Sequence, residues 1–264
     1  MSARVRTAGV AGSLFLLVLF LGGEILFGVL VAVAAMVGVY EALHLGSEGA
    51  SPLGGRFASA WGGVIVLGFF WGGPAMPGAL LALGTVLYFV LWIRGPGPTP
   101  EMPVCWGRVA GAWVLVALFI GHAVWIRRHG PLAVLFPLLI VWAGDTAAYY
   151  VGSAFGRRKL APTVSPNKSV EGAAASMVAA IATGVLASAA FSLPHGLLAG
   201  ALLGVVLNLL AQVGDLAESL LKRCAGCKDS GSILPGHGGL LDRIDALLPV
   251  LPVYAGYLAW ATGG

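Results

Sequence analysis

Residues 24–44, EILFGVLVAVAAMVGVYEALH, decide the fold class of this 264-residue chain. The stretch has no polar side chain between Ile25 and Val39. A helix of about 20 apolar residues crosses a hydrocarbon core of about 30 Å. Only helices and closed barrels satisfy their backbone hydrogen bonds in lipid, and an unbroken apolar run is typical of the helix. The segment therefore predicts a membrane-spanning helix.

Comparable apolar runs recur along the whole chain, which is 58% hydrophobic and only 10% charged. Soluble domains carry about 25% charged residues, so this class is excluded. Forty glycines, many inside the apolar runs, suit close helix packing in lipid. We predict an all-α polytopic membrane protein with about nine transmembrane helices, at 9–22, 24–44, 57–72, 76–94, 107–126, 131–152, 172–192, 196–221 and 244–261.

The positions of the basic residues predict the orientation. If the N-terminus is cytoplasmic, 13 of the 15 Lys and Arg residues lie in cytoplasmic segments, and only Arg127 and Arg128 lie outside. We expect a multi-pass protein of the cytoplasmic (inner) membrane, with loops 153–171 and 222–243 in the cytoplasm. The net charge of +4 favours contact with anionic membrane lipid. Nothing resembles a nucleic-acid-binding module, so no nucleic-acid partner is expected.

The turn-rich run 95–100, GPGPTP, indicates a division of the chain. We interpret residues 1–100 as N-terminal transmembrane helices that serve packing, dimer contacts or lipid access, and 101–264 as the catalytic half. The polar residues Glu24, Tyr40, Glu41 and His44 lie near predicted span ends, and we interpret them as interfacial anchors and packing residues.

Three carboxylates, Asp145, Asp215 and Glu218, fall inside predicted spans. Each costs about 2.5–3.5 kcal/mol at the bilayer centre on insertion scales, which argues for a polar cavity. Asp215, Glu218 and Lys222 share one helical face by their spacing, with Ser219 beside it. Such carboxylates can bind a hard cation such as Mg²⁺. The alternative is a Glu218–Lys222 ion pair that steadies the helix bundle.

The run 219–245, SLLKRCAGCKDSGSILPGHGGLLDRID, concentrates charge in this apolar chain. Gly238 and Gly239 permit close backbone approach and can aim N–H groups at phosphate oxygens. Asp242 and Asp245 can share a helical face, Asp242 can also cap that helix, and Arg243 can bind a phosphate with two hydrogen bonds. The alternative is a solvated loop.

The two cysteines of this run, Cys224 and Cys227, form a CxxC motif without two further zinc ligands nearby. A thioredoxin-like context is also absent, so we expect no chemistry from them.

A second polar block spans residues 145–172, DTAAYYVGSAFGRRKLAPTVSPNKSVEG. Asp145 and Tyr149 lie one helical turn apart. Gly152 and Gly156 indicate where that helix gives way to a loop. The small polar groups and lysine of SPNKS, 165–169, at the start of the next helix, suit a phosphate chain. We expect Glu171 to pair with Lys168 or to help bind a metal.

The two blocks together resemble the phosphatidate cytidylyltransferase (CDP-diacylglycerol synthase) family. The family pattern S-x-x-K-R, then K-D, then P-x-H-G-G-x-x-D-R-x-D is matched by Ser219, Lys222, Arg223, Lys228, Asp229, Pro235, His237, Gly238, Gly239, Asp242, Arg243 and Asp245. The block D-T-x-A-Y…G…S-P-x-K-S-x-E-G is matched from Asp145 to Gly172. The first 130 residues resemble the family only in their hydropathy.

The resemblance implies an enzyme that condenses CTP with phosphatidic acid and releases CDP-diacylglycerol and pyrophosphate. It also implies a homodimer with a metal centre near the cytoplasmic surface, which holds either Mg²⁺ alone or Mg²⁺ with a second cation. Its metal ligands would be Asp215 and Asp242, with Glu218 and Asp245 as further candidates. The catalytic residues would be Asp215, Asp242, Lys222, Arg243 and Lys168. The substrate-binding residues would be Ser165, Asn167, Ser169, Ser219, Arg223, Lys228, Asp229, His237, Gly238, Gly239, Asp145 and Tyr149.

Three other functions fit parts of the pattern. A related CTP-dependent membrane transferase acting on an isoprenoid lipid would need a similar polar site. An ion-coupled transporter could bind its cation at Asp145, Asp215 and Glu218, but it predicts inverted repeats, and the intramembrane polarity lies in one half only. A structural scaffold would not need the Asp242–Asp245 cluster.

Overall fold

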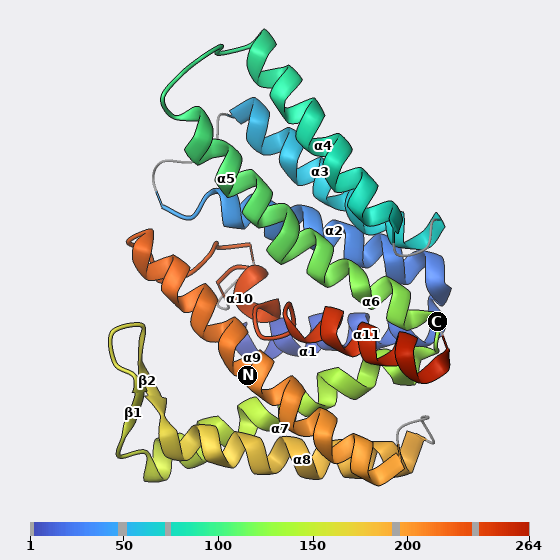
Figure 1. Cartoon of the computed structure of the whole chain (residues 1–264). Coiled ribbons are helices and arrows are strands. Elements are labelled where there is room, and N and C mark those ends of the chain that lie inside the picture. Colours follow the sequence, from blue (N-terminus) through green and yellow to red (C-terminus); the bar gives the residue numbers. More distant parts are fainter. Residues whose placement is uncertain (1–2, 47–51, 72–74, 192–195, 234–237, 264) are drawn as a thin grey trace. The chain divides into compact units, whose positions relative to one another are not determined.

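A computed structural model describes residues 3–46, 52–71, 75–191, 196–233 and 238–263, and this part of the chain is almost entirely helical (Figure 1). The all-α prediction is confirmed, with one short hairpin as the exception. The helices are α1 (Ala3–Leu21), α2 (Gly23–Leu43), α3 (Pro52–Trp71), α4 (Ala75–Arg94), α5 (Met102–Ala112), the π-helical η1 (Trp113–Leu118), α6 (Phe119–Arg127), α7 (Pro131–Phe155), α8 (Val170–Phe191), α9 (Gly196–Cys224), α10 (Leu241–Ile244) and α11 (Val250–Thr262).

Six helical segments in the described residues are long and apolar enough to cross a membrane: Gly23–Leu43, Ala75–Arg94, Met102–Arg127, Pro131–Phe155, Val170–Phe191 and Gly196–Cys224. The predicted count of nine is not confirmed. The last predicted span, 244–261, loses its start to turns, and α11 is left with 13 residues. At the other end, the apolar part of α1 is only Gly9–Leu21.

The chain forms two compact units. One contains Met1–Arg128 with Ala225–Ile244, and the other contains His129–Cys224 with Asp245–Gly264. These bounds differ from the division expected at residue 100, whose functional meaning stays a prediction.

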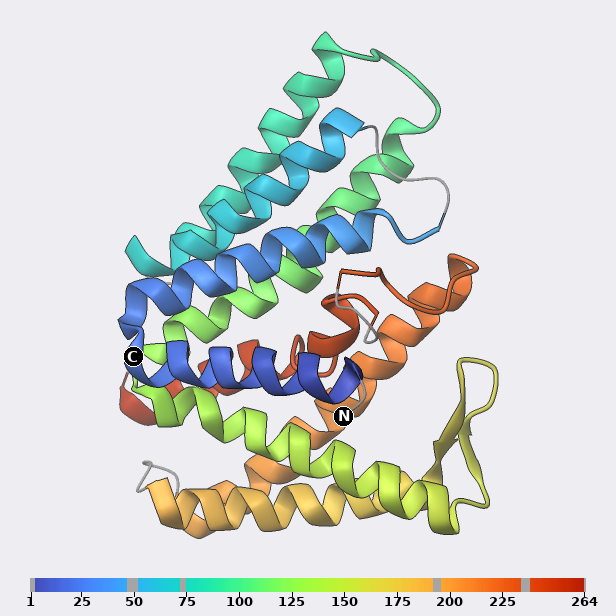
Figure 2. The same cartoon turned by 180° about the vertical axis from the view of Figure 1, so that it is seen from behind.

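In the first unit, α2 packs on α3 and α3 packs on α4, as both views show (Figures 1 and 2). Glycines admit aromatic rings at these contacts. A Cβ at Gly84 would lie 2.1 Å from Trp61 Nε1, which donates to the Leu80 carbonyl at 2.8 Å. A Cβ at Gly28 would lie 2.0 Å from the Phe70 ring. Gly28 and Gly84 therefore serve helix packing, as predicted for the glycines of the apolar runs.

Arg128, an exception to the predicted charge bias, has a partner in this unit. Its guanidinium donates hydrogen bonds to the carbonyls of Phe69 and Phe70 at 2.9 and 2.6 Å. These carbonyls belong to the last turn of α3, which lacks partners within the helix. Arg128 thus serves as a C-terminal cap for α3.

In the second unit, α7 and α8 run side by side in both views, and α8 also packs along α9 (Figures 1 and 2). The connection between α7 and α8 is an antiparallel hairpin of β1 (Lys159–Ala161) and β2 (Ser165–Ser169), with Lys159 opposite Ser169 and Ala161 opposite Ser165. The sequence interpretation, which took 153–171 as a loop, missed this hairpin because its strands are only three and five residues long.

The predicted helix break at Gly152 is wrong, because α7 continues to Phe155. Gly152 instead lets α8 approach: a Cβ at Gly172 would lie 3.2 Å from the Gly152 Cα and 2.8 Å from the Ala148 carbonyl oxygen. Gly156 does follow the end of the helix, as predicted. The close crossing at Gly152 and Gly172 fixes where the hairpin begins and ends.

Candidate active site

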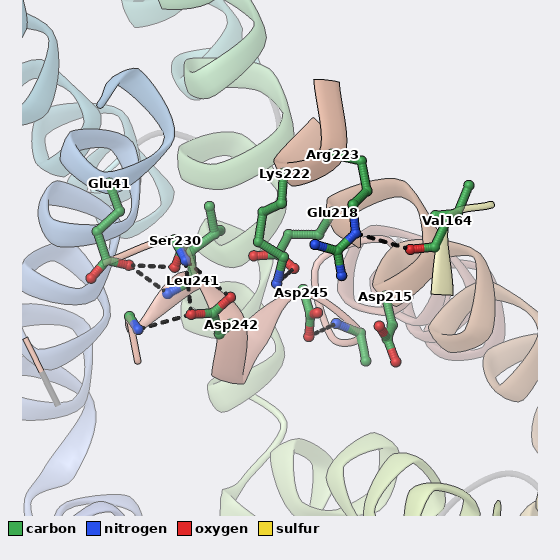
Figure 3. Close-up of polar contacts among 12 residues, drawn as sticks. Glu41, Val164, Asp215, Glu218, Lys222, Arg223, Ser230, Leu241, Asp242 and Asp245 are labelled. Atoms are coloured by element: carbon green, nitrogen blue, oxygen red, sulfur yellow. Dashed lines mark hydrogen bonds and ion pairs between the residues drawn. The ribbon is translucent and has the colours of Figure 1, made fainter. Parts of the chain in front are cut away.

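The polar face of α9 carries the central charged residues of the second unit. Lys222 Nζ forms an ion pair with the Glu218 carboxylate one turn earlier, and these two side chains are 13% and 6% exposed (Figure 3). The Glu218–Lys222 ion pair, which the sequence suggested as an alternative to metal binding, is therefore present. Because the pair is buried, removing either partner would leave an uncompensated charge.

The hairpin brings a second cation onto the same helix. Lys168 Nζ, from β2, lies 2.5 Å from Asp215 Oδ2, and the two side chains are 26% and 35% exposed. Arg223 Nε donates to the carbonyl oxygen of Val164 at 3.4 Å, which also ties the hairpin to α9 (Figure 3). The two motif blocks thus meet within one unit. We had expected Glu171 to pair with Lys168 or to help bind a metal. Lys168 instead pairs with Asp215.

Glu171 and Ser169 hold the hairpin to the start of α8. The Glu171 carboxylate accepts hydrogen bonds from the backbone N–H groups of Arg157 and Arg158 at 3.1–3.2 Å. The buried Ser169 hydroxyl accepts one from the N–H of Gly172 at 3.1 Å. This contact is that of a helix N-cap, so Ser169 has a structural role in addition to the substrate contact proposed for it.

Asp145 and Asp245 add negative charge around Lys168 and Asp215. Asp145, on α7, interacts electrostatically with both of these residues. Asp245 follows α10, and its backbone packs against α9 at Gly214. A Cβ at Gly214 would lie 2.6 Å from the Asp245 carbonyl oxygen. Desolvation, and then repulsion from Asp215, raise the pKa of Asp245 to about 7. Carboxylates therefore outnumber cations here, which favours binding of a metal ion or a cationic group.

Among the described residues, no group of three or more His, Cys, Asp and Glu side chains is arranged to hold a metal ion. Asp215 lies in the second unit and Asp242 in the first. The two ligands that the resemblance implies thus belong to different units, and the shared metal stays a prediction.

In the first unit, Asp242 organises the glycine-containing loop before it. Its carboxylate accepts hydrogen bonds from the backbone N–H of Ser230, at 3.0 and 3.2 Å, and of Gly239, at 2.9 Å. Gly238 has φ +81°, a conformation that favours glycine. The Gly239 N–H, predicted to face a phosphate, thus binds Asp242 instead. Asp242 lies inside the first turn of α10 and not at its cap position.

The remaining predicted residues lie at or near the surface. Arg223, Lys228, Asp229, Arg243, Asn167 and Tyr149 are exposed, and Ser165 and Ser219 are half-buried. Tyr149 contacts the ring of Tyr150 edge-on. His237 lies outside the described residues. Cys224 and Cys227 form no disulfide bond within the described residues.

Sequence reasoning missed two polar groups. The carboxylate of Glu41, taken as an interfacial anchor, is buried and accepts hydrogen bonds from the loop that ends at α10. Its position offered a signal, because a carboxylate in the last turn of a helix opposes the helix dipole and needs donors. In the second unit, Gln212 donates to Asn208 at 2.6 Å, and Asn208 donates to Ser176 at 2.7 Å. The bond between Asn208 and Ser176 joins α8 to α9 about two turns before Asp215.

Comparison with known proteins extends the resemblance to the whole chain. The sequence profile of the cytidylyltransferase family matches residues 2–261. A phosphatidate cytidylyltransferase of Pseudomonas aeruginosa is 36% identical over 263 residues, which cover 95% of this chain and 96% of the relative. Proteins of the same name from Bacillus subtilis and Brucella suis are 31% and 35% identical, over 96% and 94% of this chain and 95% and 89% of their own lengths.

Proposed function

Because this chain belongs to the cytidylyltransferase family, we propose that it transfers the cytidylyl group of CTP to phosphatidate, forming CDP-diacylglycerol and pyrophosphate. The observation that carries this function is the similarity to phosphatidate cytidylyltransferases over nearly the full length of both chains. That similarity favours the phosphatidate enzyme over the isoprenoid transferase, the transporter and the scaffold. The many membrane-length helices suit an enzyme whose lipid substrate stays in the bilayer.

The reaction needs positioning more than proton transfer. An ionised phosphate oxygen of phosphatidate attacks the α-phosphorus of CTP, and the bond to the β-phosphate oxygen breaks as pyrophosphate leaves. Since the nucleophile is already an anion, no strong general base is required. The protein contributes by holding the phosphates in line and by stabilising their charge.

The cations of the second unit suit this task. Lys168 and Lys222 each form an ion pair with a carboxylate of α9, and Arg223 lies exposed at the end of the same helix. Ion pairing fixes the two ammonium groups before substrate arrives, so less reorganisation is needed when phosphates bind. We assign phosphate binding to these three residues, together with Lys228 and Arg243 of the other unit.

The residues around Asp215 fit a magnesium ion. Mg²⁺ prefers oxygen ligands and commonly takes only one or two protein carboxylates, with water and substrate phosphate oxygens as the rest. Asp215 and Asp245 repel each other, which is the electrostatic condition a divalent cation relieves. We propose Asp215 as a ligand, with Asp242, Asp245 and Glu218 as further candidates. When bound, the ion would offset charge on the phosphates.

Chelation tests the metal separately from the residues. We expect EDTA to stop CDP-diacylglycerol formation and added Mg²⁺ to restore it, while the zinc chelator phenanthroline has no effect. Full turnover in excess EDTA would remove the metal from the proposal.

The orientation and assembly belong to the same proposal. CTP is dissolved in the cytoplasm, so a site that uses it must open on the cytoplasmic face of the inner membrane. The positive-inside bias supports this placement for the ends of α7 and α9. The resemblance also implies a homodimer. Cross-linking in native membranes would test the dimer, and cysteine labelling of intact cells would test the orientation.

A direct assay tests the function. Purified protein in detergent micelles is given radiolabelled CTP and either phosphatidate or an isoprenoid phosphate. We expect CDP-diacylglycerol and equimolar pyrophosphate with phosphatidate, and no product with the isoprenoid. Product from the isoprenoid alone would replace the proposed substrate, and absence of both products would contradict the function.

A further inference from the structure

The Glu41 carboxylate, near the end of α2, is the centre of an unusual set of contacts within the first unit. It accepts hydrogen bonds from the backbone N–H groups of Leu240 at 3.0 Å and Leu241 at 2.7 Å, and from the Ser230 hydroxyl at 3.3 Å (Figure 3). Glu41 is only 3% exposed. Burial of a carboxylate is costly unless donors surround it, so these three donors explain how Glu41 is tolerated.

Two glycines let the loop close around this carboxylate. A Cβ at Gly231 would lie 2.7 Å from Glu41 Oε1, and a Cβ at Gly239 would lie 2.6 Å from Glu41 Oε2. A Cβ at Gly239 would also lie 2.1 Å from the Ser230 hydroxyl. The Glu41 carboxylate and the Ser230 hydroxyl take part in hydrogen bonds, so neither group can move aside without breaking those bonds. The loop backbone is therefore shaped to fit Glu41.

Ser230 links Glu41 to Asp242. Its hydroxyl donates to Glu41 while its backbone N–H donates to Asp242, and the Gly239 N–H also donates to Asp242. The two carboxylates thus hold the two ends of segment 230–241. Because the same loop residues bind Asp242 and Glu41, the contact with α2 also supports the position of Asp242.

We propose that Glu41 is a positioning residue for the active-site loop. By binding the loop backbone, it holds the described parts of the loop, residues 228–233 and 238–243, in the conformation in which Lys228, Asp242 and Arg243 meet the substrate phosphates. Glu41 itself touches no substrate. The inference rests on the proposed function for what the loop binds, but the role of Glu41 in ordering the loop stands without it.

The test compares Glu41→Gln with Glu24→Gln, an exposed glutamate at the opposite end of the same helix. Glutamine keeps the size of the side chain but replaces one acceptor oxygen with a donor, which faces the N–H groups of the loop. We expect amide exchange of segment 229–241 to rise about tenfold or more in Glu41→Gln and to stay unchanged in α4, because the loop then opens locally. Glu24→Gln should match the wild type in both segments.

Kinetics separate positioning from general damage. If the loop is ordered only part of the time, substrate binding must order it, so KM for CTP should rise about tenfold while kcat falls less than about threefold. A merely structural role would lower the folded fraction, seen as lost kcat and a lower Tm with KM unchanged. Ser230→Ala, which removes only the longest bond, should shift KM in the same direction by about twofold to threefold and guards against failure of Glu41→Gln to fold.

Two results would overturn the inference: unchanged amide exchange in segment 229–241 of a folded Glu41→Gln variant, or an unchanged KM together with a reduced kcat. Failure of the wild type to form CDP-diacylglycerol would instead refute the proposed function and leave the exchange result standing.

Discussion

Two regions of the molecule differ in how far apart along the chain their interacting residues lie. The first is the hairpin with α9, and the second is Glu41 with the loop before α10. In the first region, Glu218 and Lys222 are four residues apart on one helix. In the second, Glu41 binds residues 189 to 200 positions away. Local spacing reveals the first kind of contact, and only the folded chain reveals the second. A charge-rich motif is therefore no guide to the residue that holds it in place.

The largest effect is expected from Asp215→Asn, which removes the charge at the centre of the first region. Activity should fall about 1,000-fold or more, because the proposed metal ligand is lost and Lys168 loses its anionic partner. Since the side chain is 35% exposed, the protein should still enter the membrane and elute as wild type on size exclusion. Near-normal activity would separate Asp215 from the chemistry.

A smaller loss is expected from Lys168→Ala, about 100-fold in kcat/KM, because phosphates lose one cation while the metal ligand remains. Lys168→Arg keeps the charge and should recover much of the activity, although its planar group fits the Asp215 contact differently. In the double variant with Asp215→Asn the losses should not add, because the two side chains act as one pair. Strict additivity would show that they work independently.

The second region can be probed through Gly239→Ala. The added methyl would meet the Ser230 hydroxyl and the Glu41 carboxylate, so we expect a loss of about 1–3 kcal/mol in stability of the loop and about tenfold in kcat/KM. Amide exchange of 229–241 measures the first effect. Gly107→Ala, at a glycine of the same unit with open surroundings and no positive φ, controls for the added methyl group alone. Equal effects from both variants would remove the role of the Glu41 contact.

The smallest effect is expected at the CxxC motif, which connects α9 to the following loop along the chain. Cys224→Ser and Cys227→Ser, singly or together, should change activity less than twofold and stability by at most about 0.5 kcal/mol, as usual for surface substitutions. Loss of activity only in the double variant, reversed by zinc, would instead give these thiols a role as metal ligands.

Much of the second unit was predictable from sequence. The apolar runs place α7, α8 and α9 within a few residues, and the shared face of Asp215, Glu218 and Lys222 follows from helical periodicity. The hairpin was missed because strands of three and five residues are too short to show a clear alternation of polar and apolar side chains. Gly152 was read as a helix break because glycine at a helix end and glycine at a close helix crossing look alike in sequence.

By itself, the sequence determined the class of protein, an all-α membrane protein, because apolar length and backbone hydrogen bonding leave few other structures in lipid. It also determined the chemical character of the site, since the types and spacing of its charged residues are readable directly. Only the tertiary structure decided which residues hold that site. Lys168 meets Asp215, and Glu41 meets the loop of Asp242, because chain segments distant in sequence pack together, and a buried carboxylate persists only where such packing supplies its donors.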